Sequence, residues 1–206
     1  SFAGFLDLAV FRQDFSDFIE FTFGPWGPDE GESPNEANAY GLGFMSVNTG
    51  GSKVTGGEIS INGRFQMDRI RIDVLTGYTY TNPVSTTPGF NYNPDSTSNY
   101  AATYYGTSHD TTGLILKYRS PHVFRFDAQI SGAKWFGGLS LRYQTNLQNF
   151  DQAFISFEEN PAISGINWGA RDWLEQNPAL PWIIDARFGR EWSNGHKITL
   201  LMNNIT

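Results

Sequence analysis

The stretch that decides the fold is Ile70-Arg-Ile-Asp-Val-Leu-Thr-Gly-Tyr-Thr-Tyr80. Its even positions are isoleucine, valine or tyrosine, with one threonine, whereas Arg71, Asp73 and Thr79 occupy odd positions. Successive side chains of a β-strand point to opposite faces, so this spacing separates apolar from polar chemistry. The stretch therefore predicts a strand with one apolar face and one polar face.

The same alternation recurs in six further stretches, which predicts seven strands and an all-β fold. The longest is residues 113–131, where most apolar residues keep to even positions on both sides of Pro121. It predicts a single strand of roughly 18 residues with a bend or bulge at the proline, far longer than a typical globular strand. In the first stretch the clean parity is lost near Asp14. The seven stretches are residues 5–23, 55–61, 70–80, 113–131, 135–143, 182–188 and 198–202.

The connections between these strands alternate between long and short. The long ones cover about residues 24–40, 82–112 and 150–181, and short turns lie at residues 65–69, 132–134 and 191–196. Long loops on one side only are unusual in soluble domains. They are typical of outer-membrane barrels, which have short periplasmic turns and long extracellular loops. The sequence thus predicts an antiparallel transmembrane β-barrel segment spanning residues 1–206.

Aromatic residues make up 16% of the chain, and many lie at or near the expected strand ends. Such amphipathic rings suit the interface between lipid and water. The alternative is that they form the core of a soluble β-sandwich. Charged residues at mid-strand on the other face count against that alternative, because they fit a wet barrel lumen. The aromatics are Tyr78, Tyr80, Tyr118, Trp135, Tyr143, Trp182 and Trp192, and the charges are Arg71, Asp73, Arg125, Asp127, Asp185 and Arg187.

The net charge, the short apolar runs and the lack of cysteine exclude several other classes of protein. The net charge is −7, which argues against a nucleic-acid partner. A membrane helix needs about 20 apolar residues, and the longest run here, residues 180–184, contains Pro181. There is no cysteine, so disulfides and thiolate metal sites are excluded. The chain starts directly in a strand-like pattern at Ser1, so we expect a processed chain or a fragment.

No catalytic, cofactor or metal site is expected. His109, His122 and His196 lie far apart in different contexts, and no phosphate-binding glycine loop is present. The acidic residues near Asp29 lack the spacing of a calcium loop, so a solvated loop is favoured there. We therefore expect that the protein is not an enzyme.

The third long connection holds the candidate ligand- or partner-facing residues Trp168, Arg171 and Trp173. Exposed tryptophan and arginine are favoured at binding sites. The alternative is that these residues pack the loop on itself or on a neighbouring loop.

Five short motifs follow one another along the chain. They are Gly4-Phe-Leu-Asp-Leu-Ala-Val-Phe11 with Asp17-Phe-Ile-Glu-Phe-Thr-Phe-Gly24, Val47-Asn-Thr-Gly50 with Thr55-Gly-Gly-Glu58, Gly77-Tyr-Thr-Tyr80, Leu116-Lys-Tyr-Arg-Ser-Pro-His122, and Asn203-Asn-Ile-Thr206. In this order they resemble late barrel strands of TonB-dependent outer-membrane receptors of the Bacteroidetes type. The resemblance covers essentially the whole chain.

The resemblance implies the C-terminal portion of a barrel of about 22 strands in the outer membrane of a Gram-negative cell. Seven strands leave two open edges, which cannot face lipid unpaired. The remainder of the barrel and a plug, in the same chain or another subunit, are therefore expected partners, as are outer-membrane lipid and TonB through an N-terminal region absent here.

Two functions follow from the resemblance. One is TonB-driven import of an iron chelate, a glycan or a peptide. The other is a receptor-like barrel that serves as a scaffold in a multi-protein outer-membrane complex, with a surface lipoprotein as partner.

Overall fold

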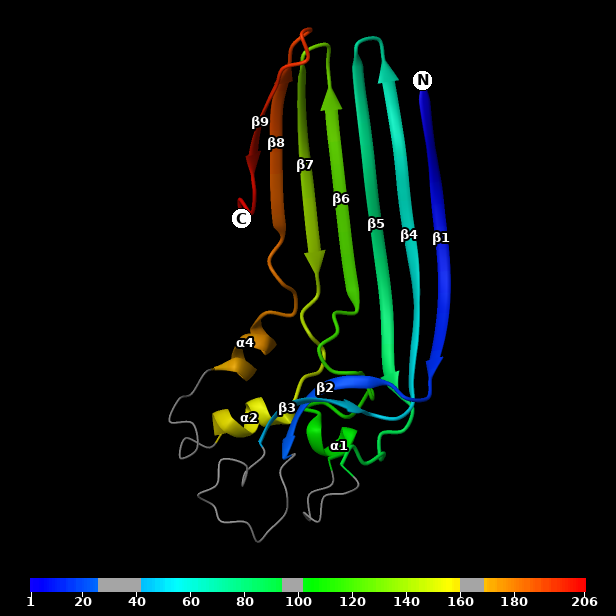
Figure 1. Cartoon of the computed structure of the whole chain (residues 1–206), viewed down its shortest axis with the longest axis vertical. Coiled ribbons are helices and arrows are strands. Elements are labelled where there is room, and N and C mark those ends of the chain that lie inside the picture. Colours follow the sequence, from blue (N-terminus) through cyan, green and yellow to red (C-terminus); the bar gives the residue numbers. More distant parts are fainter. Residues whose placement is uncertain (26–41, 94–101, 160–168) are drawn as a thin grey trace.

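The computed structural model describes residues 1–25, 42–93, 102–159 and 169–206. Its main element is a seven-stranded antiparallel sheet in the order β1-β4-β5-β6-β7-β8-β9, hereafter the wall (Figure 1). The strands of the wall are β1 (Phe2–Phe15), β4 (Ser52–Met67), β5 (Ile70–Ser85), β6 (His122–Ser131), β7 (Trp135–Gln144), β8 (Ile183–Glu191) and β9 (Lys197–Met202).

The register of the wall keeps the apolar positions together. Ile59 of β4 lies opposite Tyr78 of β5, and Tyr78 lies opposite Phe124 of β6. Directly opposite residues share a face, so the apolar sets of neighbouring strands merge into one continuous face. This confirms the prediction from alternation. The apolar face includes Leu6, Leu8, Val10, Ile59, Ile61, Ile72, Val74, Phe126, Leu139, Leu141, Ile184, Phe188, Ile198 and Leu200.

The predicted long strand over residues 113–131 is wrong in its first half. β6 begins only at His122, and the preceding segment has backbone φ angles of 54° at Leu114 and 59° at Tyr118. This left-handed conformation cannot continue a strand. Leu116 and Lys117 between them are buried. The segment is a folded loop whose odd and even pattern matched a strand by coincidence.

The first predicted strand is also divided. β1 ends at Phe15, and β2 (Ile19–Pro25) pairs with β3 (Leu42–Asn48) in a separate two-stranded sheet. Backbone hydrogen bonds of Phe18 with Gly50 and Thr49 fix the bend between β1 and β2. At the next connection, β5 continues to Ser85, so the expected loop over 82–112 starts later.

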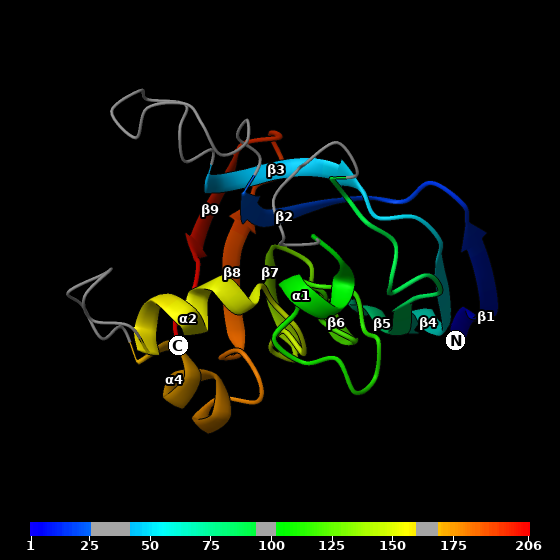
Figure 2. The ribbon, with the colours of Figure 1, turned by 90° about the horizontal axis from the view of Figure 1, so that it is seen from below.

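The long connections lie at one end of the wall and the short turns lie at the other (Figure 1). We call these the loop end and the turn end. At the loop end lie β2, β3, α1 (Tyr104–Thr107), α2 (Gln152–Glu159) and α4 (Ala170–Gln176). Viewed from this end, the wall forms an arc, and β2 and β3 run across its open side (Figure 2). With residues 108–121 and 145–151, these elements form what we call the loop cluster.

Every buried apolar side chain of the described residues belongs to the loop cluster or the segments leading into it, and none lies on the wall. On the wall, large apolar side chains are exposed, with Val10 exposed at 92%. A soluble β-sandwich would bury one face of such a sheet against another. This distribution argues against that alternative. The seven buried apolar residues are Val47, Tyr92, Ala102, Tyr104, Leu116, Phe150 and Ile155.

Within the described parts of the chain, no helix has the length and apolar character needed to cross a membrane.

Candidate functional site

Aromatic side chains gather at both ends of the apolar face. Near the loop end, the Tyr143 and Trp182 rings lie 4.8 Å apart, and the Tyr78 hydroxyl lies 2.7 Å from Nδ1 of His122. At the turn end, Trp135 stacks on Phe188 with a centroid distance of 5.2 Å. Two aromatic belts of this kind flank the apolar band of membrane barrels.

The spacing of these belts fits a bilayer. Trp135 begins β7 and Tyr143 lies near its end. At about 3.4 Å per residue, they are roughly 27 Å apart along the strand, close to the apolar band of about 25 Å in outer-membrane barrels. Of the seven predicted belt residues, Tyr118 is placed elsewhere, because its hydroxyl donates to Asp151 in the loop cluster.

The opposite face of the wall carries hydrogen-bonded ion pairs. The Arg187 guanidinium donates to both carboxylate oxygens of Asp127, at 2.7 and 2.8 Å, and its Nε donates to Oε1 of Gln129 at 3.1 Å. The Ser140 hydroxyl donates to the same carboxylate. This group joins β6, β7 and β8, and a bidentate pair holds both planar groups in one orientation.

Three further ion pairs lie on this polar face. Asp73 accepts from Arg64 at 2.6 Å and pairs with Arg71 at 2.8 Å, and Arg142 pairs with Asp185 at 2.9 Å. Across all the pairs on this face, the side chains are between 21% and 61% exposed. These charges stand in water or against a polar neighbour, which is the environment of a barrel lumen.

A buried ion pair lies in the loop cluster. The Lys117 ammonium donates to Oδ1 of Asp151 at 2.7 Å, to the Thr107 hydroxyl at 3.0 Å and to the Thr22 hydroxyl. Asp151 also accepts from Thr22 at 2.6 Å and from the Tyr118 hydroxyl. The side chains of Lys117 and Asp151 are almost completely buried. A buried pair is tolerated when its remaining polar atoms are satisfied in this way.

The members of this network come from all three long connections. Thr22 belongs to the connection between β1 and β4, Thr107 and Lys117 belong to that between β5 and β6, and Asp151 belongs to that between β7 and β8. The network therefore fixes the three connections to one another. Their sequence separations reach 129 residues, so no local pattern could have revealed the set. The buried lysine lay inside the segment that alternation assigned to a strand.

Hydrogen bonds of Asn149 hold together the neighbouring part of the loop cluster. The Asn149 side-chain amide donates to the Tyr104 hydroxyl at 2.9 Å and to the Ile115 carbonyl at 2.7 Å. Its Oδ1 accepts from the backbone N–H groups of Phe150 and Asp110. Burial raises the pKa of Tyr104 to about 12, so its hydroxyl stays protonated.

Glu20 on β2 is buried, and its Oε2 has no hydrogen-bond partner among the described residues. Burial raises the pKa of this carboxyl, although the nearby positive charges of Lys117 and Arg119 act in the opposite direction. A buried charge without full hydrogen bonding destabilises its surroundings. Glu20 is therefore a weak point in an otherwise well-paired cluster.

Of the predicted ligand-facing residues, Trp168 lies outside the described residues. Arg171 on α4 pairs with Glu159 of α2 at 2.6 Å, and its backbone N–H donates to Glu158. Trp173 is 50% exposed. Residues two positions apart do not share a helix face, so Arg171 and Trp173 point in different directions. Arg171 holds α4 to α2, as the self-packing alternative expects, and ligand binding stays a prediction.

In the residues that the structure describes, no three His, Asp or Glu side chains come together as a metal site would require. His109 stacks on Phe150 at 4.6 Å, and His122 contacts the belt residue Tyr78. Two of the three histidines therefore pack against aromatic rings.

The comparison with known families agrees with this geometry. The family model described as TonB dependent receptor-like, beta-barrel matches residues 2–204. The chain belongs to this family. No curated protein and no solved structure matches the chain. The chain is thus part of the β-barrel of an outer-membrane receptor, and its open seven-stranded wall is a segment of that barrel.

Proposed function

We propose that the chain forms part of the C-terminal barrel wall of a receptor that imports a nutrient across the outer membrane without a catalytic step. The observation that supports this most is the two-faced wall, with aromatic belts on one face and ion pairs on the other. The apolar face contacts lipid, and the polar face lines the lumen, where a plug fits. Further strands of the barrel pair with β1 and β9, because strand edges in lipid must be hydrogen-bonded.

In this proposal the loop end faces the outside of the cell, as long loops do in outer-membrane barrels. In the loop cluster, β2 and β3 run across the open side of the arc, and they then meet the substrate before it enters the lumen (Figure 2). The substrate is an iron chelate, a glycan or a peptide, and TonB supplies energy through the plug.

A scaffold role is the second candidate. The observation that favours it is Trp173, which stands half exposed on α4 at the loop-end rim. Exposed tryptophans are common anchors of protein interfaces. A surface lipoprotein bound at this rim would make the barrel a subunit of a larger outer-membrane complex.

Growth and uptake in a strain that lacks the complete receptor distinguish these functions. If the receptor is an importer, the strain fails to take up one member of a panel of iron chelates, glycans and peptides. A strain without TonB should show the same defect. Normal uptake of the whole panel, together with loss of a lipoprotein from the outer membrane, would instead establish the scaffold.

The loop residues are tested in the same strain. Replacing Trp168→Ala together with Trp173→Ala should lower uptake at limiting substrate, because aromatic faces are lost from the binding surface. The matched control is Tyr105→Ala, which removes another exposed ring of the loop cluster. Unchanged uptake in the tryptophan variant would remove these residues from the binding surface.

A further inference from the structure

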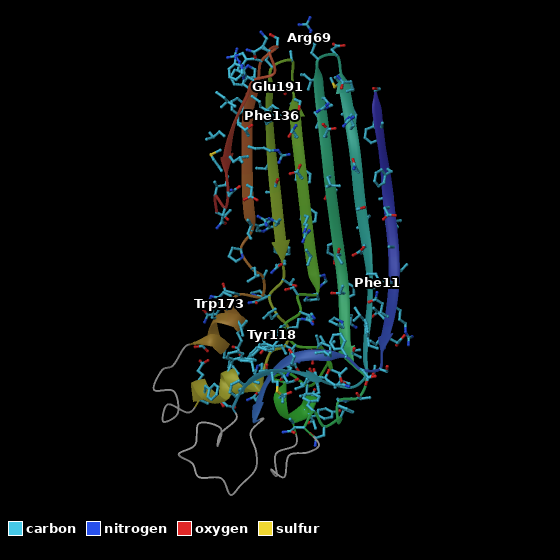
Figure 3. All side chains as sticks on the ribbon, viewed as in Figure 1. Phe11, Arg69, Tyr118, Phe136, Trp173 and Glu191 are labelled. Carbon is cyan, nitrogen blue, oxygen red and sulfur yellow. The ribbon has the colours of Figure 1, made fainter. Side chains whose placement is uncertain are left out.

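A cavity of about 670 Å³ lies at the turn end of the wall. Its charged side chains are Arg69, Arg71, Lys134, Lys197 and the single acid Glu191. Figure 3 shows Arg69 and Glu191 close to the turns, with Phe136 just below them. The chain as a whole has a net charge of −7, so this excess of positive charge is local. It lies on the polar face, which Arg71 and Lys197 share by register.

The floor of the cavity is apolar and closely fitted. The Phe136 ring lies over Gly189 on the neighbouring strand β8, where a Cβ would come within 2.2 Å of the ring. Lys197 lies above the same ring, with its Nζ 4.4 Å from the ring centroid. A cation over an aromatic face keeps its charge available on the open side. Because Gly189 has no side chain, the Phe136 ring can lie against β8, with the Lys197 ammonium over the ring.

Within the described parts of the chain, most of these cations have no salt-bridge partner. Among the described residues, Arg71 forms a salt bridge with Asp73, whereas Arg69, Lys134 and Lys197 form none. In the loop cluster, by contrast, Lys117 is matched by a buried carboxylate. Lys197 lies opposite Glu191 in the register of β8 and β9, but the cations of the cavity still outnumber this single acid. Such an excess of positive charge attracts carboxylates, and the field is strongest where the walls are of low dielectric.

The shape of the cavity decides which anion fits. Its lining residues run from Gln66 on β4 to Lys197 on β9, across six adjacent strands. At about 4.8 Å between strands, this path is roughly 24 Å long. An extended chain of about seven residues covers that distance. A polypeptide matches this length, whereas a phosphate or a single lipid headgroup would fill only part of it.

We propose that this turn-end cavity binds an extended, acidic segment of a polypeptide. Carboxylates pair with Arg69, Lys134 and Lys197, and an apolar side chain of the segment rests on Phe136. An anionic lipid is the less suitable occupant, because the cavity opens on the polar face. The lipid-side cation at this end is Arg190, which lies over Trp135 and Trp192 at 4.8 and 4.9 Å. The proposal holds whether the barrel imports a nutrient or serves as a scaffold.

The test uses the complete receptor in detergent and a fluorescein-labelled peptide of seven residues, four of them glutamate. The control peptide carries glutamine in place of each glutamate. We expect fluorescence anisotropy to show binding of the acidic peptide that is at least tenfold tighter than that of the control. Binding should weaken between 50 and 500 mM NaCl, because salt screens exposed charges. Equal affinity for the two peptides would overturn the proposal.

The receptor variant with Arg69→Gln, Lys134→Gln and Lys197→Gln should bind the acidic peptide about tenfold more weakly, since each exposed pair contributes modestly. The control variant carries Arg12→Gln, Lys53→Gln and Arg119→Gln near the loop end and should bind normally. An equal loss in both variants would mean that general attraction, not the cavity, holds the peptide. Displacement of the peptide by a short-chain phosphatidylglycerol, but not by unlabelled peptide, would assign the cavity to lipid instead.

The floor is tested by Phe136→Leu, which keeps an apolar side chain but removes the flat ring. We expect peptide affinity to fall two- to threefold. The three basic positions lie in or beside exposed turns, so that variant should fold even where Phe136→Leu does not, and heat-modifiable migration on gels checks the folding of both. Unchanged affinity of a folded Phe136→Leu variant would contradict the assigned floor.

Discussion

The wall and the loop cluster differ in the burial of their charged and apolar side chains. The loop cluster buries Lys117 and Asp151 together with apolar side chains such as Tyr104 and Ile155, as the interior of a soluble protein does. The wall buries no large apolar side chain and leaves its ion pairs partly exposed. The loop cluster is therefore stabilised by its own contacts, whereas the wall relies on hydrogen bonding between strands and on lipid.

The largest effect is expected from breaking the buried pair. Lys117→Met leaves Asp151 buried without a cation, which should destabilise the loop cluster by about 3–5 kcal/mol. Hydrogen exchange of amides in α1, α2 and β2 measures this opening, and amides in the wall should keep their protection. The control Arg119→Met removes the neighbouring exposed cation.

A second variant sharpens this prediction. Adding Asp151→Leu to Lys117→Met removes the unpaired charge and should restore part of the lost protection. If the single variant instead lowered protection in the wall as strongly as in the loop cluster, the two regions would not be independent.

The two faces of the wall are compared by placing the same charge on each. Leu139 and Leu75 are both exposed leucines, but Leu139 lies on the apolar face and Leu75 on the polar face. Leu139→Arg should cost about 2–4 kcal/mol if that face is in lipid, and Leu75→Arg should cost less than about 1 kcal/mol. Urea titration of the complete barrel in lipid vesicles measures both. Similar costs for the two variants would contradict the assignment of the faces.

The smallest effect concerns Glu20. Burial raises its pKa. The charged or titratable groups around it are Lys117, Arg119, Asp151, Tyr92, Tyr104 and Tyr118. A raised pKa means that the folded cluster binds the proton more tightly than the open form. The contribution of Glu20 to the stability of the loop cluster is therefore fully present below the ordinary glutamate pKa and is lost as the pH rises through the raised value.

Replacing Glu20→Gln removes this dependence and should stabilise the loop cluster at neutral pH by up to about 1 kcal/mol. Hydrogen exchange of the α1 and α2 amides at pH 5 and 7.5, corrected for the intrinsic effect of pH, measures the change. Parallel pH profiles for the variant and the original protein would show that another group titrates.

Alternation predicted the wall well because lipid and water impose opposite chemistry on alternate side chains over most of each strand. Ile70 to Tyr80 of β5 is the clearest case. The loop cluster was not predictable in the same way. In the segment before β6, apolar and polar residues continue largely to alternate, but Leu114 and Tyr118 have positive φ angles and the backbone is not a strand. Alternation with a period of two residues carries no information on φ.

The sites differ for a related reason. Arg171 and Trp173 were found by residue type alone, and the structure uses Arg171 to hold two helices together. The Lys117 network and the turn-end cavity join residues from separate connections or separate turns. Only the folded arrangement brings such residues together. Their proximity therefore could not be predicted from the sequence, although each residue can be read there.

The shared network in the loop cluster has a consequence for how such receptors diverge. Thr22, Lys117 and Asp151 come from three connections and depend on the same hydrogen bonds. A change of one of them is tolerated only with a matching change in another connection. Evolution can therefore exchange residues outside this network one loop at a time, while the network itself must be inherited as a unit.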